Sequence, residues 1–393
     1  MGNSKVNMDS IPEDMWEKID NKEKESDLIS RPSLTYFQDA WRRLRKNIMS
    51  MIGLVIIIIL ILTAMFGPLF SKYNFSDQSL KMASLPPRLE LFKIDNENYI
   101  YLANGLKIYS STSNGEIINL LNPVKQDFQK KFKVYELNGR EIVLDFSDKP
   151  FKLLNKNDNE YPFYKKVWNK NHLLGTDDLG RDLLIRIIYG ARISLLIAFV
   201  ATLVNFFIGV LYGGISGYAG GRVDNIMMRI VDIISTVPLM LYVILLMVVL
   251  KPGLKPIIIA LGSVFWVRMA RLVRGQILSL KEQEFVMAAK TIGATNLRIL
   301  VRHLLPNAMG PIIVSMTMMI PTAIFTEAFL SFIGLGVPAP LASWGTLCNN
   351  ALGGYRSYPY QLFLPSLAIC ITMLAFNFLG DGLRDALDPR LRK

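Results

Sequence analysis

The side chains that bind metals or act as nucleophiles are few in this sequence and stand far apart. Among its 393 residues there are two histidines, His172 and His303, and two cysteines, Cys348 and Cys370. A zinc or iron site needs several such ligands converging on one point, and a disulfide framework is recognised by a regular set of cysteines. The sequence therefore predicts neither a metal centre nor a disulfide scaffold.

Catalysis by the chain itself is not expected. No segment has the G-x-x-x-x-G-K-[ST] spacing of a phosphate-binding loop, so the chain itself is not expected to hydrolyse ATP, and no cofactor is predicted. A membrane-embedded enzyme would need a nucleophile and a base, or a metal, gathered within its spans. His303 and His172 both fall outside the predicted spans, so the residues give no such set.

One acidic residue, Glu327 in "IPTAIFTEAFLSFIGLG", lies well inside an apolar segment. A charge within the bilayer is costly and is seldom left unpaired. Glu327 is therefore a candidate for the lining or gate of a translocation path, with Pro321 and Met318 on the same segment as further candidates. The alternative is a helix-to-helix hydrogen bond near the outer surface, and the residues alone leave both open.

The elements that must position these residues are long apolar segments. The composition is 51% hydrophobic and 19% charged, and about 20 apolar residues suffice to cross a hydrocarbon core of ~30 Å. The first segment starts too late for a cleaved signal peptide, and the fourth contains Arg268 and Arg271 near its far end. We predict an all-α polytopic membrane protein with six transmembrane helices, at 48–70 and at roughly 191–216, 230–250, 255–275, 308–333 and 361–380.

The formal net charge of +12 reflects where the basic residues lie along the chain. Arginine and lysine are frequent just before the first span ("WRRLRKN"), in the loop at 276–306 and at the C-terminus ("RDALDPRLRK"), whereas the loop near 334–360 has only Arg356. Cytoplasmic loops of membrane proteins carry such an excess. The pattern places both termini and the 276–306 loop in the cytoplasm, and it argues against a nucleic-acid partner.

The first 47 residues divide into two parts. Residues 1–30 are polar and rich in lysine and acids, which is typical of a mobile tail. The following "RPSLTYFQDAWRRLRKN" mixes aromatic rings with cations, as helices at the headgroup layer do. We predict a cytoplasmic tail and an interfacial helix before the first span.

Residues 71–170 differ in composition from the rest of the chain. "KKFKVYEL" and "REIVLDF" alternate like strands around Asn138-Gly139, and "NYIYLANGLKIYSS" has Asn104-Gly105 near its centre. Asn-Gly fits a type I′ turn because both central residues need a positive φ. We predict a small β-rich domain, extracellular by topology, inserted between the first two spans.

The chain returns to the membrane through "HLLGTDDLGRDLLIRIIYGARISL", which begins at His172. Its acids lack the alternate-position spacing of a calcium-binding EF-hand loop. We expect Asp177, Asp178, Arg181 and Asp182 to cap an outer amphipathic helix that leads into the second span, after a tight turn at Gly180.

A second polar stretch, "EFVMAAKTIGATNLRILVRHLLPN" at 284–307, lies between two predicted spans. Its apolar residues recur at helical spacing on both sides of Gly293. Gly293 can end a first helix, and the Thr295 hydroxyl can cap a second, which then runs to Pro306. Physical chemistry alone leaves two interpretations: an amphipathic helix on the bilayer or on the chain's own spans, or a helix that docks into another protein.

This stretch resembles the EAA-loop signature of ABC importer permeases, E-A-A-x3-G-x9-I-x-L-P. Met287 stands in place of the glutamate, with Glu284 nearly one turn earlier, and His303 stands in place of the isoleucine. The matching residues are Ala288, Ala289, Gly293, Leu305 and Pro306. Other segments resemble the C-type permease subunits of oligopeptide, dipeptide and nickel importers, among them "GGRVDNIMMRIVDI", "TEAFLSFIGLGV", "WGTL" and "LAFNFLGDGLRDALDPRLR", so that the resemblance covers about 31–70 and 171–393.

The resemblance implies a permease core of the type I importer (MetI-like) fold at 171–393, in a bacterial plasma membrane. It also implies that the 276–306 loop docks into a cleft of a cytoplasmic ATPase and carries nucleotide-driven movement into the spans. The coupling residues would be Glu284, Ala288, Ala289, Gly293, Ala294, Arg298, Leu305 and Pro306. The implied partners are a second permease subunit, two ATPase subunits that hold ATP and Mg²⁺, a substrate-binding lipoprotein, membrane lipid and a peptide substrate.

Two alternatives to a peptide importer stay open at this point. Nickel is the other cargo of similar permeases, and peptides are favoured because no cluster of metal ligands lines the predicted spans. A stand-alone secondary transporter would show broken helices in two repeated halves, which the sequence does not. The region at 71–170 is longer than the connection typical of the family, and we predict that it docks the lipoprotein, covers the outer mouth or stabilises the complex.

Overall fold

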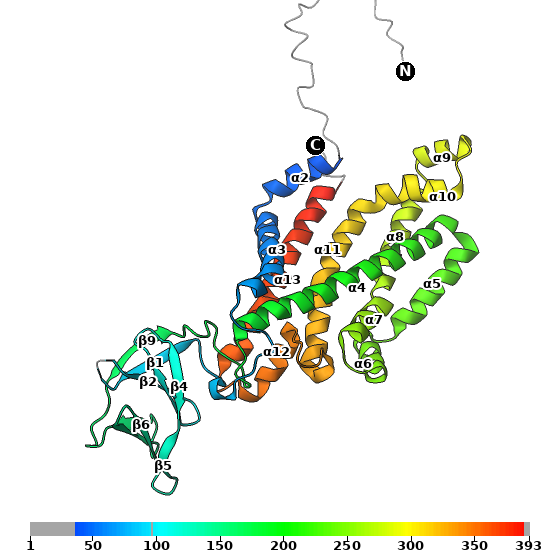
Figure 1. Ribbon diagram of the computed structural model, residues 1–393. Helices are drawn as coiled ribbons and strands as arrows, with labels where there is room; N and C mark the ends of the chain where they lie inside the picture. The colour runs from blue at the N-terminus through cyan, green and yellow to red at the C-terminus, as the bar shows by residue number, and fades with distance from the viewer. Residues whose placement is uncertain (1–35, 96, 389–393) are drawn as a thin grey trace, which may run out of the picture.

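The computed structural model describes residues 36–388, apart from residue 96, and shows a helical body with a β region at one end (Figure 1). The predicted tail at 1–30 lies outside the described residues. The predicted interfacial segment forms α2 (Tyr36–Lys46), which packs through Ala40 and Leu44 on the last turns of α13 (Pro359–Leu387).

The other helices of the body follow the apolar segments of the sequence. They are α3 (Ile48–Phe66), α4 (Leu183–Ala219), α5 (Gly221–Thr236), α6 (Leu239–Leu250), α7 (Leu254–Val264), α8 (Trp266–Leu280), α9 (Glu284–Thr291), α10 (Asn296–Ile299), α11 (Leu305–Leu330) and α12 (Trp344–Ala351). Short 3₁₀ turns occur at Gly67–Phe70, Leu80–Met82 and Leu352–Gly354, and π turns at Leu300–Leu304 and Ser331–Leu335.

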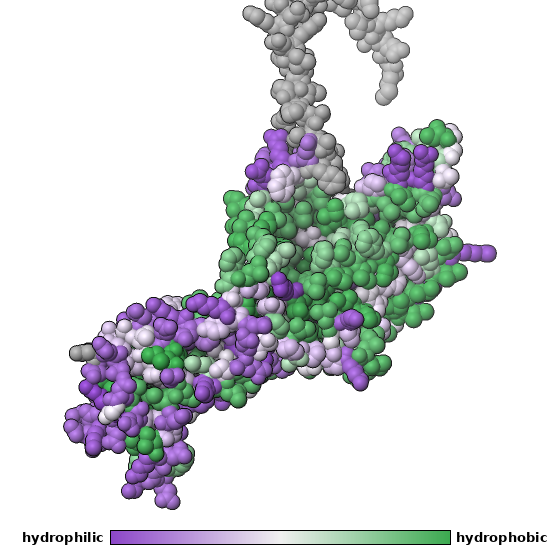
Figure 2. Space-filling view, in the orientation of Figure 1, coloured by the Kyte–Doolittle hydropathy of each residue, from purple (hydrophilic) through white to green (hydrophobic). Residues whose placement is uncertain are grey.

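Within the described residues, five helical stretches are long and apolar enough to cross a membrane. They are Ile48–Phe70, Leu183–Ala219, Leu254–Leu280, Asn296–Leu335 and Pro359–Leu387. A sixth is present if α5 and α6, which are bent by 81° against each other, form one broken span. Figure 2 shows the matching surface, with hydrophobic residues over the helical body and hydrophilic ones over the β region and the opposite end.

The segment predicted as the third span, 230–250, is therefore not one straight helix. α5 ends at Thr236 and α6 begins after Pro238, whose ring cannot donate the backbone hydrogen bond that a continuous helix needs. The fourth, with its arginines, runs on as one candidate span through α7 and α8. The break lies in the predicted third span, and the mean hydropathy of that segment does not reveal it.

The second span begins earlier than predicted. Instead of a separate outer helix followed by a span, α4 is one helix of 37 residues, about 55 Å long at 1.5 Å per residue. That exceeds the hydrocarbon thickness of ~30 Å, so α4 must tilt or project from it. Figure 1 shows α4 running obliquely across the body, from the β region to the end that carries α9 and α10.

The β region contains two antiparallel sheets. One has the order β4-β3-β2-β1-β9 and the other β5-β6-β7-β8. Ile100 and Ile108 of the first sheet share an apolar core with Ile142 and Leu144 of the second. The strands are β1 (Arg88–Lys93), β2 (Tyr99–Ala103), β3 (Lys107–Ser111), β4 (Ile117–Leu121), β5 (Pro123–Asp127), β6 (Phe132–Leu137), β7 (Arg140–Asp145), β8 (Lys152–Leu154) and β9 (Phe163–Trp168).

Both predicted hairpins are confirmed. Asn138 and Gly139 join β6 to β7 with φ values of 48° and 78°, as a type I′ turn requires. Asn104 and Gly105 lie in the connection between β2 and β3. These two hairpins belong to different sheets. The sheets have five and four strands, so they contain more strands than the two predicted hairpins supply.

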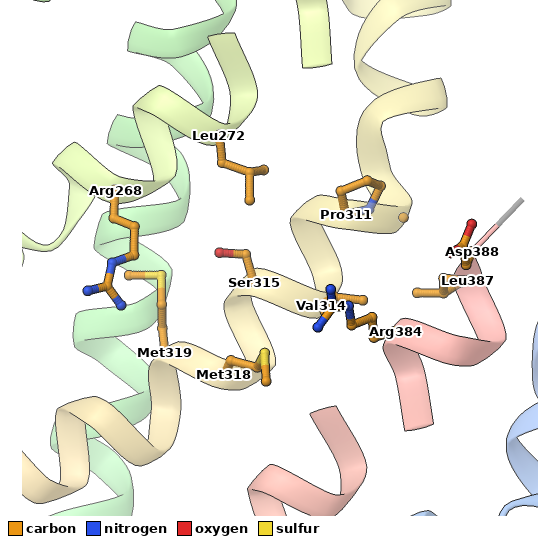
Figure 3. A pocket seen from close by; sticks show the side chains of 11 residues that line it. Arg268, Leu272, Pro311, Val314, Ser315, Met318, Met319, Arg384, Leu387 and Asp388 are labelled. Carbon is orange, nitrogen blue, oxygen red and sulfur yellow. The ribbon is translucent and has the colours of Figure 1, made fainter. Parts of the chain in front are cut away.

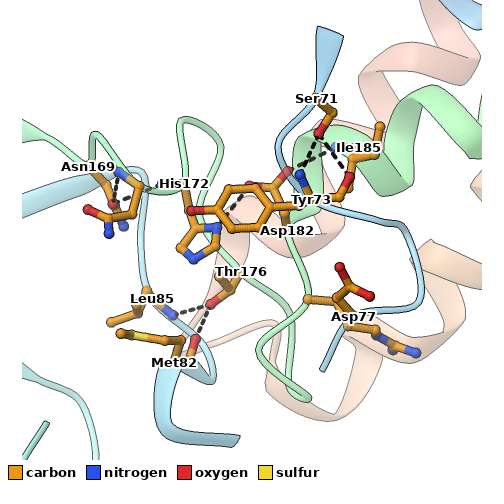
Figure 4. A network of polar contacts seen from close by, with 12 residues as sticks. Ser71, Tyr73, Asp77, Met82, Leu85, Asn169, His172, Thr176, Asp182 and Ile185 are labelled. Atoms are coloured by element: carbon orange, nitrogen blue, oxygen red, sulfur yellow. Dashed lines mark hydrogen bonds and ion pairs between the residues drawn. The ribbon is translucent and has the colours of Figure 1, made fainter. Parts of the chain in front are cut away.

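The β region leaves and rejoins the body at one place. The first and last strands pair, with Arg88 opposite Trp168, and Asn169 N–H donates to the Pro87 carbonyl at 2.9 Å. Thr176 secures this base, because its hydroxyl donates to the Met82 carbonyl at 2.6 Å and accepts from Leu85 N–H at 2.8 Å (Figure 4).

The same base is fixed to the start of α4 by Asp182. One oxygen of its carboxylate lies 2.9 Å from His172 Nδ1, and the other accepts a hydrogen bond of 2.9 Å from Ile185 N–H (Figure 4). The Tyr73 ring lies against the His172 ring, with 4.7 Å between centroids. The predicted cap and the turn at Gly180, with φ of 73°, are both confirmed.

Candidate functional site

The stretch that resembles a coupling loop projects from the end of the body opposite the β region (Figure 1). α9 ends at Thr291, and Gly293 then adopts a φ of 81°. The Thr295 hydroxyl accepts from Arg298 N–H at 3.4 Å and so begins α10. The helix, turn and cap that the sequence predicts in this stretch are confirmed.

The second helix does not end at Pro306, and that prediction is wrong. From Asn296 the helix continues through Pro306 into α11 and forms one candidate span to Leu335. Proline lacks an N–H, so a helix containing it must relieve nearby carbonyls in another way. Here a π turn precedes it, with Leu305 N–H bonded to the Leu300 carbonyl, and the Asn307 side chain donates to the His303 carbonyl at 2.7 Å.

The two alanines of the motif lie on different faces of α9. Ala289 is 5% exposed and Val286 is fully buried in the core of the body, whereas Ala288 is exposed. The outward surface of α9 and its turn also carries large apolar side chains, of which Ile292 is 85% exposed and Met287 54%. Such side chains at a polar end of the molecule form an unpartnered apolar surface.

The remaining predicted coupling residues divide in the same way. Glu284, Gly293, Arg298 and Pro306 are exposed. Ala294 and Leu305 are partly buried against the apolar core of the body. We call the exposed surface formed by Ala288, Met287 and Ile292 the α9 face. The residues that point inward hold this face on the body.

The base of this projection is joined to α4 and α5. The Tyr218 hydroxyl, near the end of α4, donates to the Asn296 side chain of α10 at 2.8 Å. One turn deeper, Arg274 of α8 binds the Asp224 carboxylate of α5 through two hydrogen bonds of 2.6 Å each. Ser216 of α4 donates to the same carboxylate at 2.5 Å. These contacts therefore join four helices, α4, α5, α8 and α10, near the base of the projection.

A cavity of about 510 Å³ opens among α8, α11 and α13 (Figure 3). Ser315 of α11 points towards Arg268 of α8 in this view, and Met318 and Met319 lie on the next turn. A second cavity, of about 390 Å³, also contacts Arg268 and Met319 and reaches Pro238 at the break between α5 and α6. In the sequence, Arg268 is noted only as a charge near the far end of the fourth predicted span. A cation inside a span is itself an indication of function.

The three residues predicted for a path or gate are not brought together. Met318 lines the cavity of Figure 3, whereas Pro321 is buried within α11. Glu327 is fully buried, and its carboxylate accepts from the Ser194 hydroxyl of α4 at 2.8 Å and from the Ser331 hydroxyl at 2.7 Å. These contacts join α4 to α11, which is the helix-to-helix interpretation of Glu327.

The described part of the chain contains no group of three or more histidine, cysteine, aspartate or glutamate side chains placed to hold a metal ion. Cys348 is buried and Cys370 is exposed, and both are free thiols.

Comparison with known proteins now places the chain in a family. The model of the binding-protein-dependent transport system inner membrane component matches residues 206–393, and that of the N-terminal TM domain of oligopeptide transport permease C matches residues 35–87. The oligopeptide transport system permease protein OppC of Bacillus subtilis is 43% identical over 386 residues, which is 98% of this chain and 100% of the relative. The chain belongs to this family of membrane-integral transport permeases.

Two further relatives match different shares of the chain. The dipeptide transport system permease protein DppC of B. subtilis is 41% identical over 98% of the permease and 95% of its own length. OppC of Escherichia coli K12 is 46% identical over 221 residues, 56% of the permease and 73% of its own length. The B. subtilis relatives are thus matched across nearly the whole chain, and the E. coli relative across little more than half of it.

Proposed function

We propose that the permease forms one half of the translocation pathway of an ATP-driven importer of oligopeptides or dipeptides. Its full-length relatives are named as oligopeptide and dipeptide transport permeases. Movement of cargo by such a chain requires an energy source on another protein, because the sequence has no phosphate-binding loop. The partners are a second permease subunit, two ATPase subunits that bind ATP and Mg²⁺, and a substrate-binding lipoprotein.

The observation that carries this proposal is the α9 face. Exposed apolar side chains on a short helix suit a groove on another protein, in which the helix lays its apolar surface. Ala288 has almost no side chain and allows the partner's surface to approach the backbone closely. The Gly293 turn limits the length of α9, so that the whole helix fits one groove. We assign this groove to the ATPase.

The topology that fits this function has six spans, with α5 and α6 counted as one broken span. An even number of spans leaves both termini on the same side, and the basic residues near α2 and in the 276–306 loop make that side the cytoplasm. The α9 face then lies in the cytoplasm and the β region outside the cell. Figure 1 supports this arrangement, since α2 and α9 lie at one end of the body and the β region at the other.

The cargo path in this proposal follows the cavities on both sides of Arg268. They are lined by α8, α11 and the break between α5 and α6, where backbone groups are not paired in a continuous helix. Irregular backbone at membrane depth is tolerated where it lines a cavity. Methionines 318 and 319 give this wall adaptable apolar surface, which suits cargo of varied sequence.

Replacement of Ala288 by arginine tests the docking role. Ala288→Arg should abolish association with the ATPase subunits and ATP-dependent peptide uptake, while leaving membrane insertion and the melting temperature unchanged. Co-purification of the ATPase with the permease measures the first effect. Val124→Arg, on an exposed apolar residue of β5 far from α9 (Figure 1), is the matched control and should keep ATPase association.

Ala289→Arg provides the comparison for misfolding. Because Ala289 is buried, this change should lower the melting temperature as well as ATPase association. Normal association of Ala288→Arg with the ATPase would exclude α9 as the docking helix. Gradient-driven peptide flux by the permease without any ATPase would instead indicate a secondary transporter.

A further inference from the structure

A cavity of about 520 Å³ lies at the end of the body that carries the β region, away from the cavities around Arg268. It is lined by the start of α4, the loop between α6 and α7, the loop that follows α11, and α12. The residues that line it include Arg181, Arg186, Val337, Leu341 and Asn349. The volume falls within the range of small-molecule sites.

The two arginines are almost completely removed from solvent. Arg181 is 4% exposed and Arg186 is 2% exposed. Both bind the same carboxylate: Arg181 Nε lies 2.6 Å from Asp177, and Arg186 Nη1 forms a second ion pair with it. Asp178 is 3.8 Å from Arg181 but is largely exposed at the rim. Two buried guanidinium groups therefore share one buried carboxylate.

Arg186 also has a hydrogen-bond donor without an acceptor. Its Nε is buried and has no partner among the described residues. A buried donor left unpaired is costly, and more so when it belongs to a charged group. Asp177 pairs with Nη1 of the Arg186 guanidinium, so the edge of the group that carries Nε is not used by Asp177. That edge of a guanidinium is one that binds a carboxylate through two parallel hydrogen bonds.

The other walls suit an organic ligand rather than a bare inorganic anion. Val337, Pro338 and Leu341 provide apolar surface next to the arginines, and Thr346 provides a hydroxyl. A ligand with a carboxylate at one end and a side chain of mixed polarity fits this combination. Because the guanidinium groups are recessed, the ligand must enter the cavity rather than touch its rim.

We propose that this cavity binds the C-terminal carboxylate of the peptide cargo, with Arg186 as the principal contact and Arg181 as the second. The proposal rests on the proposed function, since it takes the cargo to be a peptide and this end to be the outer one. An acidic side chain of the substrate-binding protein offers the same group, but the burial of both arginines and the apolar residues beside them favour a small ligand that enters the cavity. The site would hold the peptide at the outer mouth by the one group that all unmodified linear peptides share.

The test uses the complete transporter without its binding protein, reconstituted in lipid nanodiscs. The probes are radiolabelled alanyl-phenylalanine and its C-terminal amide, measured by equilibrium dialysis. We expect the free acid to bind at least about tenfold more tightly than the amide, as loss of a charge-assisted pair implies. This comparison of two probes on the unchanged protein does not depend on the folding of any variant.

Variants assign the preference to the residue. Arg186→Gln should remove the preference for the acid, and Arg186→Lys should retain part of it, because lysine keeps the charge but not the fork. Arg192→Gln is the control on the same helix, because Arg192 is exposed and bonded to the Met65 carbonyl instead. It should keep the full preference.

Equal binding of acid and amide by the unchanged transporter would overturn the proposal, as would absence of binding by either probe. A preference that survives in Arg186→Gln would also overturn it. If Arg186→Gln shows no change with the probes but loses association with the binding protein, the site belongs to protein docking and the proposal is wrong. ATP-dependent peptide uptake, measured separately in proteoliposomes with the binding protein present, distinguishes these results from failure of the proposed function, which would abolish uptake in the unchanged protein.

Discussion

Arg274 of α8 and Asp224 of α5 face each other through two hydrogen bonds of 2.6 Å each. The Asp224 side chain is buried and also accepts from Ser216 of α4. This pair therefore fixes α4, α5 and α8 at the point where α9 and α10 are attached. In the proposed function, force from the ATPase enters the spans here.

Asp224→Asn should weaken this junction. The amide cannot accept from both guanidinium nitrogens and the serine, so we expect a loss on the order of 2 kcal/mol, seen as a lower melting temperature in detergent and reduced ATP-dependent uptake. Asp232→Asn is the matched control, because Asp232 makes a single 2.9 Å bridge to Arg271 between half-exposed side chains. Exposed bridges contribute about 0–1 kcal/mol, and equal effects of the two changes would contradict this role for Asp224.

Gly293 should tolerate only residues that accept a positive φ. No atom lies within 4 Å of a Cβ added there, so the constraint is the backbone rather than space. Alanine in this conformation costs roughly 1–2 kcal/mol and asparagine less, whereas proline cannot adopt a φ of 81°. ATPase association should therefore fall in the order glycine, asparagine, alanine, proline, and a fully active Gly293→Pro would refute the predicted turn.

Glu327→Gln and Glu327→Ala should separate a structural role from a role in cargo passage. The glutamine amide can still bond to the hydroxyls of Ser194 and Ser331, so we expect nearly normal melting and uptake. Alanine leaves both hydroxyls without Glu327 and should lower stability by about 1–3 kcal/mol. Loss of uptake in Glu327→Gln, with unchanged melting, would instead show that the acid takes part in gating.

The β region should be removable as a unit. Because β1 and β9 pair, residues 87 and 169 lie side by side, and a short Gly-Ser linker can join them after deletion of 88–168. We expect this variant to insert and to bind the ATPase, but to lose association with the binding protein, as measured by co-purification. Unchanged docking and uptake would show that the region has another role.

A deletion at 80–160 is the instructive comparison. It removes β1 but leaves β9, whose hydrogen-bonding edge would then be unpaired. An unpaired strand edge favours aggregation, so this variant should give a lower yield of folded protein for reasons unrelated to docking.

Turns and helix caps in this chain could be predicted from the sequence. The Asn-Gly hairpins, the Asp182 and Thr295 caps and the turn at Gly293 each depend on a few neighbouring residues, and each is confirmed. The matched family confirms the permease fold of ABC importers at the level of the family. The coupling and path assignments of individual residues stay predictions.

Features that depend on packing could not be read in this way. Ala288 and Ala289 are adjacent in sequence, and only the contact of α9 with the body decides that Ala289 is buried. The break at Pro238 lies inside a stretch that hydropathy alone treats as one span, and only the structure shows that the two helices are bent by 81° there. The cavities around Arg268 and Arg186 draw residues from helices far apart along the chain, which no spacing pattern in one segment can reveal.

The length of α4 has a mechanical consequence. Arg186 lies near one end of this single helix and Tyr218 near the other, roughly 48 Å apart at 1.5 Å per residue. An uninterrupted helix behaves as a stiff rod, so a tilt of a few degrees imposed at Tyr218 by α10 displaces Arg186 by several ångströms unless the body bends. In the proposed function, movement of the ATPase at one end of α4 would then displace Arg186 in the outer cavity at the other end. The affinity of that cavity for cargo would change with the nucleotide cycle.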